Sequence, residues 1–224
     1  MFFGWTASRW ALARAIAAAT PYVLLANPSP LTGIPYPRDV VLDAAQQLNK
    51  RGAWLIVDES LVDPVPGFSV AALAGTAAAP KLVVLRSPSA FFGLAGAPLA
   101  FIIAAGDLLA RIGKLPAVPD IAHPVRAVTR LALADTNWQA TARARLGAAG
   151  QRLQALLAPC GEVAGSPLAS VLKTPDATEL HAHLARHGIV AGHCPAASTL
   201  HFGAPHDEHA WQRLAAALAD WKAP

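Results

Sequence analysis

The strongest fold signal lies in residues 81–96, which read KLVVLRSPSAFFGLAG. The apolar run from Lys81 to Arg86 predicts a buried β-strand. Ser87-Pro88-Ser89 follows and predicts a loop, because serine and proline favour turns over strands. In open α/β sheets, ligands bind at the carboxyl ends of the strands, so a loop of this kind is a candidate ligand site.

Three further apolar runs extend this pattern over the first two thirds of the chain. They cover residues 22–27, 53–58 and 99–104 and alternate with helical patterns at 8–19 and 38–51. Continuous apolar runs are typical of strands covered on both faces, so we predict an α/β fold with a doubly wound sheet. Polar residues also follow two of these strands. They are Asn27 and Asp58-Glu59-Ser60.

The helical pattern at 38–51 has a clear apolar face and a clear end. Gly52 follows it directly, and glycine commonly terminates helices. The residues on the apolar face are Val40, Val41, Ala44, Ala45 and Leu48.

The second half of the chain predicts connecting helices and then a smaller lobe. A proline-broken linker at 116–124 leads to two helices, or one long bent helix, over 125–157. The expected buried anchors there are Leu131, Trp138, Leu146, Leu153 and Leu156. Further strands are predicted at 171–174, 189–194 and 199–202, and helices at 177–187 and 207–222.

These elements predict three parts. Residues 1–115 form a partial large domain, residues 116–157 a linker with connecting helices, and residues 158–224 a small C-terminal α/β lobe. The length of 224 residues is sufficient for one domain plus such a lobe.

The composition excludes some classes of protein. Hydrophobic residues make up 54% and charged residues 14%, which excludes a disordered chain. The net charge of +4 is spread over single arginines and lysines, so we predict no nucleic-acid partner and no membrane partner. Cys160 and Cys194 lie far apart; two reduced thiols in a cytoplasmic protein are the preferred interpretation, and a disulfide stays open.

Two segments superficially resemble targeting or membrane signals. Arg9 and Arg14 precede the alanine-rich stretch 15–19, but this stretch continues directly into the predicted strand at 22–27, which argues against a signal peptide. The uncharged stretch 90–105 is broken by Gly93, Gly96 and Pro98 and is too short for a comfortable span. We predict a soluble protein.

Several segments, in order and spacing, resemble the fold-type-I pyridoxal-phosphate (PLP) enzymes of the aminotransferase class I/II group. Within that group the L-threonine-O-3-phosphate decarboxylases of cobalamin biosynthesis are most similar, and histidinol-phosphate aminotransferases are more distant. The segments are 27–28 with 32–33, 57–60, 86–87 with 91–96, 132–136, 174–176 with 184–189, and 200–205 with 210–214.

The resemblance implies a remnant of the PLP-transferase type I fold. Family members begin with a longer N-terminal part that includes a phosphate-binding turn and three strands of the large sheet. The strands that remain here lie side by side in the family, so they can fold together, but with long apolar edges. We expect a second copy, another protein partner or the helix at 8–19 to cover these edges.

Three positions match residues that bind the cofactor in the family. Asp58 stands where an aspartate keeps the pyridinium nitrogen protonated. Ser87 matches a serine that contacts the cofactor phosphate, and Ser89 could substitute for a neighbour that does the same. Alternatively, Asp58 and the serines satisfy only local backbone groups.

Other positions lack the group that the family uses. Ala90 replaces the lysine that forms the Schiff base, so no catalytic residue is assigned. Pro98 replaces a phosphate-binding arginine, and Pro30 an asparagine that bonds the ring hydroxyl. Leu61 stands in place of the tyrosine or other polar group that assists this contact to the ring hydroxyl. His201 stands in place of the arginine that binds the substrate carboxylate.

These losses predict a degenerate, non-catalytic homologue, with no cofactor expected although PLP is the family's cofactor. One alternative is an active lyase or aminotransferase that recruits Lys81, Lys114 or a lysine of a second chain. Another is a non-enzymatic module that binds a small anion or a partner, although Asp58 would repel an anion.

No metal site is predicted. His183 and His187 are one helical turn apart, a spacing that can chelate zinc, but Asp176 or Glu179 is only a generic third ligand. Solvated helix faces explain the histidines better. Glu59 and Asp63 near Asp58 could form a hydrolytic carboxylate pair, but the sequence does not give their separation.

Overall fold

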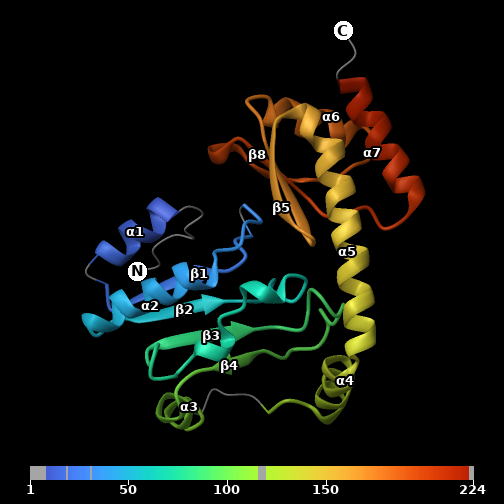
Figure 1. Ribbon diagram of the computed structural model, residues 1–224. Helices are drawn as coiled ribbons and strands as arrows, with labels where there is room; N and C mark the ends of the chain where they lie inside the picture. The colour runs from blue at the N-terminus through green and yellow to red at the C-terminus, as the bar shows by residue number, and fades with distance from the viewer. Residues whose placement is uncertain (1–8, 19, 31, 116–119, 222–224) are drawn as a thin grey trace. The chain divides into compact units, whose positions relative to one another are not determined.

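The computed structural model describes residues 9–18, 20–30, 32–115 and 120–221 (Figure 1). Residues 116–119 of the predicted linker at 116–124 therefore lie outside this description, and the last two residues of the linker belong to the helix His123–Ala134. The chain divides into two compact units, within residues 1–30 and 34–141, and within residues 31–33 and 142–224.

A four-stranded sheet organises the first unit. Its order is β1 (Tyr22–Ala26), β2 (Trp54–Asp58), β3 (Leu82–Arg86) and β4 (Phe101–Ile103). The first three strands are parallel and β4 is antiparallel to β3. The register places Ala26 beside Asp58 and Asp58 beside Leu85, so the carboxyl ends of the three parallel strands form one edge.

Helices α1 (Arg9–Ala17) and α2 (Arg38–Lys50) cover this sheet (Figure 1). The predicted apolar stripe of α2 is buried at four positions, and Val40 packs partly buried beside them. Gly52 ends the helix as predicted. Its φ is +80°, and the N–H groups of Gly52 and Ala53 donate to the carbonyls of Asn49 and Leu48, as in a Schellman motif.

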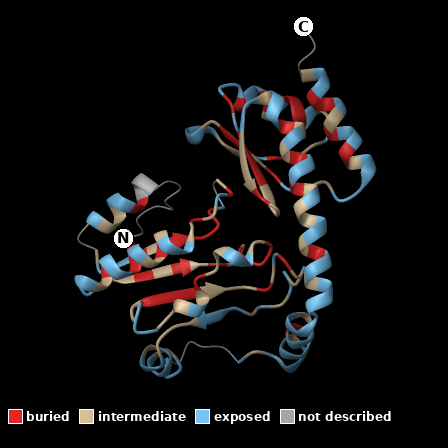
Figure 2. Cartoon of the chain, in the orientation of Figure 1, coloured by how far each residue is buried: buried red, intermediate tan, exposed pale blue. Residues whose placement is uncertain are grey.

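Burial is uneven across the sheet (Figure 2). Leu55, Val57, Leu82 and Val84 are fully buried, and burying each such side chain contributes about 1.5–3 kcal/mol. The prediction of strands covered on both faces is wrong for β4, where Phe101 and Ile102 are exposed. The strand is also shorter than the predicted 99–104, because only three of its residues pair with β3.

Two helices occupy the predicted helical stretch at 125–157, which confirms the first of the two alternatives. Helix α3 (Gly106–Ile112) precedes them; α4 (His123–Ala134) and α5 (Thr136–Leu157) are separated at Asp135, whose Oδ1 accepts from Trp138 N at 2.9 Å. Leu153 is buried as predicted. Leu131 is 73% and Trp138 39% exposed, so these predicted anchors are wrong.

The second unit is a smaller α/β lobe. Its sheet has the order β5 (Glu162–Ser166), β6 (Ala169–Lys173), β8 (Thr199–Phe202), β7 (Gly192–Cys194), and all its pairs are antiparallel. Helices α6 (Ala177–Arg186) and α7 (Glu208–Trp221) pack against each other. Strand β5 was not predicted, because its sequence, EVAGS, has a single strong β-former, Val163, and no apolar run.

No helix within the described part of the chain combines the length and the apolar character that crossing a bilayer requires.

Candidate cofactor site

Asp58 lies at the carboxyl end of β2, half-buried. Its Oδ1 accepts hydrogen bonds from Ser60 N at 2.9 Å and from Ser60 Oγ at 2.6 Å. This carboxylate oxygen therefore closes a turn within its own loop, as aspartates commonly do after strands.

Ser87 and Ser89 lie just beyond the end of β3, the neighbouring strand. Their hydroxyl groups are hydrogen-bonded to each other, and Ser89 N donates to Ser87 Oγ at 3.3 Å. The hydroxyls thus satisfy groups within the loop. Register places this loop on the same sheet edge as Asp58, because Asp58 pairs with Leu85.

Ala90 follows in this loop and its methyl group is exposed. The loop is anchored on its far side by Phe91, which is buried and contacts the rings of Phe92 and Trp138 edge-on, at centroid distances of 4.9 and 5.4 Å. Aromatic contacts of this geometry each add about 0.5–1.5 kcal/mol to the burial of the rings. The loop is therefore held by apolar packing while Ala90 offers no reactive group.

The remaining predicted positions carry few polar groups. Pro30 and Pro98 are exposed, and Leu61 is partly buried. His201 is on β8 of the second unit, with Nε2 3.3 Å from Thr199 Oγ1. The structure thus brings Asp58, Ser87, Ser89 and Ala90 to one sheet edge, whereas His201 belongs to the other unit.

A buried cluster of charged residues lies beside this edge, and the sequence did not predict that its members contact one another. Glu59 is fully buried; it accepts hydrogen bonds from Ser69 Oγ at 2.6 Å and from Val70 N at 2.5 Å. Arg86 contacts Glu59 at 4.0 Å and forms a hydrogen-bonded ion pair with Asp63.

This cluster settles the arrangement of the suspected carboxylate pair. Glu59 and Asp63 both face Arg86, so one guanidinium holds the two carboxylates. Burial raises the pKa of Glu59, and its bonds to Ser69 and Val70 and the charge of Arg86 oppose that rise. In the sequence, an acidic residue and an arginine at the ends of neighbouring strands could have indicated this ion pair. Its contacts, however, depend on how the loop at 59–70 folds.

Asn27 connects the loops at the same edge. It is fully buried, its Oδ1 accepts from Tyr36 N at 2.7 Å, and its backbone N donates to Asp58 O at 2.8 Å. Its side-chain amide also donates to Phe68 O at 3.4 Å. The residue therefore has a structural role in shaping this edge.

The sequence model of the family "Aminotransferase class I and II" matches residues 4–161. The chain belongs to this family.

Two curated relatives illustrate the match. Threonine-phosphate decarboxylase of Pseudomonas aeruginosa is 40% identical over 204 residues, which are 90% of this chain and 61% of that protein. Histidinol-phosphate aminotransferase of Shewanella oneidensis is 33% identical over 137 residues, 60% of this chain and 34% of that protein. The chain thus spans about three fifths of the length of the first relative and about a third of the second.

Solved structures of family members have the same fold. Histidinol-phosphate aminotransferase from Clostridium acetobutylicum superposes with a TM-score of 0.83 at 17% identity, covering 95% of this chain and 67% of that one. The enzyme from Sinorhizobium meliloti, solved in complex with pyridoxal-5'-phosphate, gives 0.79 at 22% identity, covering 94% and 59%. The predicted fold class and family resemblance are confirmed.

The residues of this aminotransferase-family chain do not fit a covalently held PLP. The loop after β3 offers a methyl group at Ala90, and the two serine hydroxyls bond each other. Asp58 is the charged candidate; its Oδ1 accepts from Ser60 and its second carboxylate oxygen can still accept a bond, so the misfit rests on Ala90.

Proposed function

We propose that this chain is a non-catalytic member of the PLP-dependent aminotransferase class I/II family, related to threonine-phosphate decarboxylase. By that relationship it is connected to cobalamin biosynthesis. Ala90 carries the proposal: it stands at the position that the family resemblance assigns to the Schiff-base lysine, and an alkyl side chain cannot form an imine.

The placement of Lys81 supports the proposal against an active enzyme with a recruited lysine. Its Nζ donates to Gly52 O at 2.7 Å and lies 5.8 Å from the Trp54 ring centroid, at the amino end of the parallel strands. Ser87 is six residues further along the chain, just beyond the end of β3, which corresponds to roughly 20 Å of extended chain. Lys81 therefore lies at the wrong edge of the sheet.

Lys114 is also poorly suited. It follows α3, and its backbone N donates to Arg111 O, which places it at the helix end. No observation favours its reaching the loop at 87–90.

The internal bonding of the inherited polar groups adds support. Asp58 binds Ser60, and Ser87 binds Ser89, so each group is used to shape its own loop. The serine pair leaves one hydroxyl hydrogen for a ligand phosphate, and Asp58 would repel the phosphate. The same charge argues against the small-anion module.

A spectroscopic titration tests the proposal. The purified chain is mixed with one equivalent of PLP, and its visible spectrum is compared with that of the P. aeruginosa threonine-phosphate decarboxylase treated identically. We expect no internal-aldimine band and no release of carbon dioxide from threonine phosphate. A band that borohydride removes, or measurable decarboxylation, would overturn the proposal; Lys81→Arg and Lys114→Arg would then identify the amine.

We further propose that a second copy or another protein covers the open sheet edge at β4. Phe101 and Ile102 are 38% and 41% exposed there, which supports a need for cover. Sedimentation of the purified chain tests this. Self-association that Ile102→Lys weakens is expected for a second copy, and a monomer that binds no partner would contradict both versions.

A further inference from the structure

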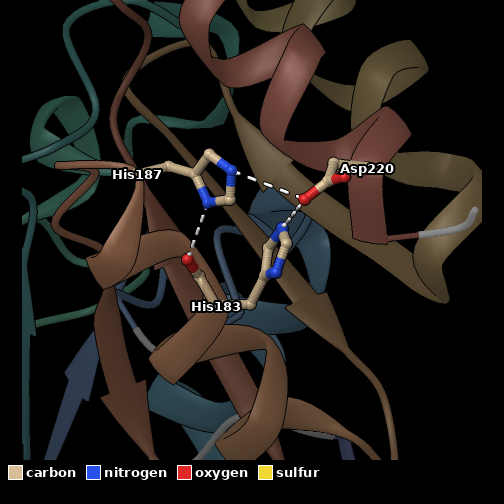
Figure 3. A group of neighbouring side chains, drawn as sticks. All are labelled: His183, His187 and Asp220. Atoms are coloured by element: carbon tan, nitrogen blue, oxygen red, sulfur yellow. Dashed lines mark hydrogen bonds and ion pairs between the residues drawn. The ribbon is translucent and has the colours of Figure 1, made fainter.

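Two histidines and an aspartate meet between α6 and α7 in the second unit (Figure 3). His183 is on α6, His187 is the residue that caps its C-terminus, and Asp220 is in the last turn of α7. His183 is buried, so the prediction that these histidines lie on solvated helix faces is wrong for it. Asp220 is remote in sequence from the pair, so the spacing of the histidines does not identify it as a third ligand.

The donor atoms lie at separations that suit one small cation. Asp220 Oδ2 is 3.5 Å from His187 Nε2 and 3.8 Å from His183 Nε2, and all three ligand atoms are within 4.8 Å of one another. Two ligands on one tetrahedral zinc ion at about 2.1 Å lie roughly 3.4 Å apart. Small side-chain movements close the remaining difference.

The hydrogen-bond pattern favours a cation between His187 and Asp220. His187 Nδ1 is 3.0 Å from His183 O, a carbonyl that can only accept, so Nδ1 carries the hydrogen of the neutral ring. The bare lone pair of His187 Nε2 then faces Asp220 Oδ2, which is also an acceptor. Only a positive ion between them, a proton or a metal, makes this contact favourable.

The Nδ1 contact also prepares His187 as a ligand. Metal-bound histidines commonly donate their second N–H to a carbonyl, which fixes the tautomer and the ring orientation. The Schellman-type end of α6 holds the residue in place, since Gly188 N and Ile189 N donate to Ala185 O and Leu184 O. The C-terminal ends of α6 and α7 carry partial negative charge, which favours a cation.

We propose that His183, His187 and Asp220 form a binding site for a transition-metal ion of the zinc class, with water in the open position. His183 Nε2 lies 2.8 Å from Ala217 O, an acceptor, so Nε2 carries a hydrogen here; metal binding replaces this hydrogen bond, and the hydrogen passes to Nδ1 or to solvent. The ion joins the last turn of α7 to the end of α6. The site is independent of the proposed loss of catalysis in the first unit.

Zinc titration of the chain without a histidine tag tests the site, by competition with a chromophoric chelator. We expect one zinc per chain, and at least a tenfold weaker affinity in His187→Ala and in Asp220→Asn. Both residues are partly or largely exposed, so these variants should fold. Zinc should also raise the melting temperature of the wild type but not of these variants.

Two matched variants distinguish this site from adventitious binding. His206 forms an exposed pair with Asp207 at 3.0 Å and lies outside the three-ligand group, so His206→Ala should leave affinity unchanged. His193 stacks on His181 with a centroid distance of 4.7 Å and precedes Cys194. His193→Ala therefore tests whether zinc binds at this second group of residues instead. No detectable binding, or binding that His187→Ala leaves intact, would overturn the proposal.

Discussion

The interior of the first sheet and its carboxyl edge differ in what their side chains do. In the interior, Leu55, Val57 and Leu82 are fully buried against α2 and neighbouring strands, as in a protein that depends on this core for its stability. At the edge, Asp58, Ser87 and Ser89 bond to residues of their own loops. The residues that stabilise the fold are buried in the interior of the sheet, so the fold does not depend on the polar groups at its carboxyl edge.

Beside the edge, however, Glu59, Asp63 and Arg86 form a charged cluster whose members bind one another. Its carboxylates require Arg86, because a buried charge without a partner is costly. The polar groups that stabilise the fold are therefore different residues from the polar groups that the resemblance assigns to cofactor binding.

Removing Arg86 should have the largest effect. Arg86→Met leaves Glu59 and Asp63 buried without a counter-charge, and we expect a loss of about 3–5 kcal/mol in the free energy of unfolding. Urea denaturation measures it. Arg111→Met on the exposed face of α3 is the control, expected to change stability by less than about 0.5 kcal/mol. A similarly small loss of unfolding free energy in both variants would show that the cluster of Glu59, Asp63 and Arg86 does not stabilise the fold.

Truncating the interior should have the next largest effect. Leu55→Ala should cost about 2–5 kcal/mol, because it deletes a fully buried side chain. Leu131→Ala, at a side chain that is 73% exposed, should cost about 0.5 kcal/mol or less. If urea denaturation gave Leu131→Ala the same loss of unfolding free energy as Leu55→Ala, the exposed face of α4 would be covered by another molecule in solution.

The charge of Glu59 should appear in the pH dependence of stability. Its pKa is raised in the folded state, so the protonated form is favoured there and stability falls as pH rises from 4.5 through the folded pKa. Glu59→Gln removes this titration. The stability of wild type relative to this variant should therefore decrease over that range, in unfolding measured at several pH values. A relative stability that increases instead would show that the contacts with Ser69, Val70 and Arg86 dominate.

Asp58→Asn should have the smallest effect. The asparagine carbonyl can still accept from Ser60 N, so we expect a change of about 0.5 kcal/mol or less in unfolding free energy and no change in the visible spectrum with PLP. A spectral difference between the two proteins would indicate that Asp58 still contacts the coenzyme.

Sequence reasoning predicted the elements that depend on local pattern. The parallel strands β1–β3 and the end of α2 at Gly52 were predicted because apolar runs and helix terminators are local signals. Strand β5, the exposure of Leu131 and Trp138, and the burial of His183 were not, since each depends on what packs against the segment.

The same limit applies to the sites. Asp58, Ser87 and Ala90 could be placed on one edge from strand ends alone. The contacts of Arg86 with Glu59 and Asp63, and of Asp220 with His187, join residues distant in sequence, so only the fold reveals them.

Peptide mapping by mass spectrometry tests the central claim most directly. The folded chain is incubated with one equivalent of PLP, reduced with borohydride and digested, and the labelled fraction of each lysine is measured. We predict that no lysine is labelled beyond the level that the same coenzyme gives with the urea-unfolded chain. Near-complete labelling of a single lysine in the folded chain alone would contradict the claim that the anchor at Ala90 has been lost without replacement.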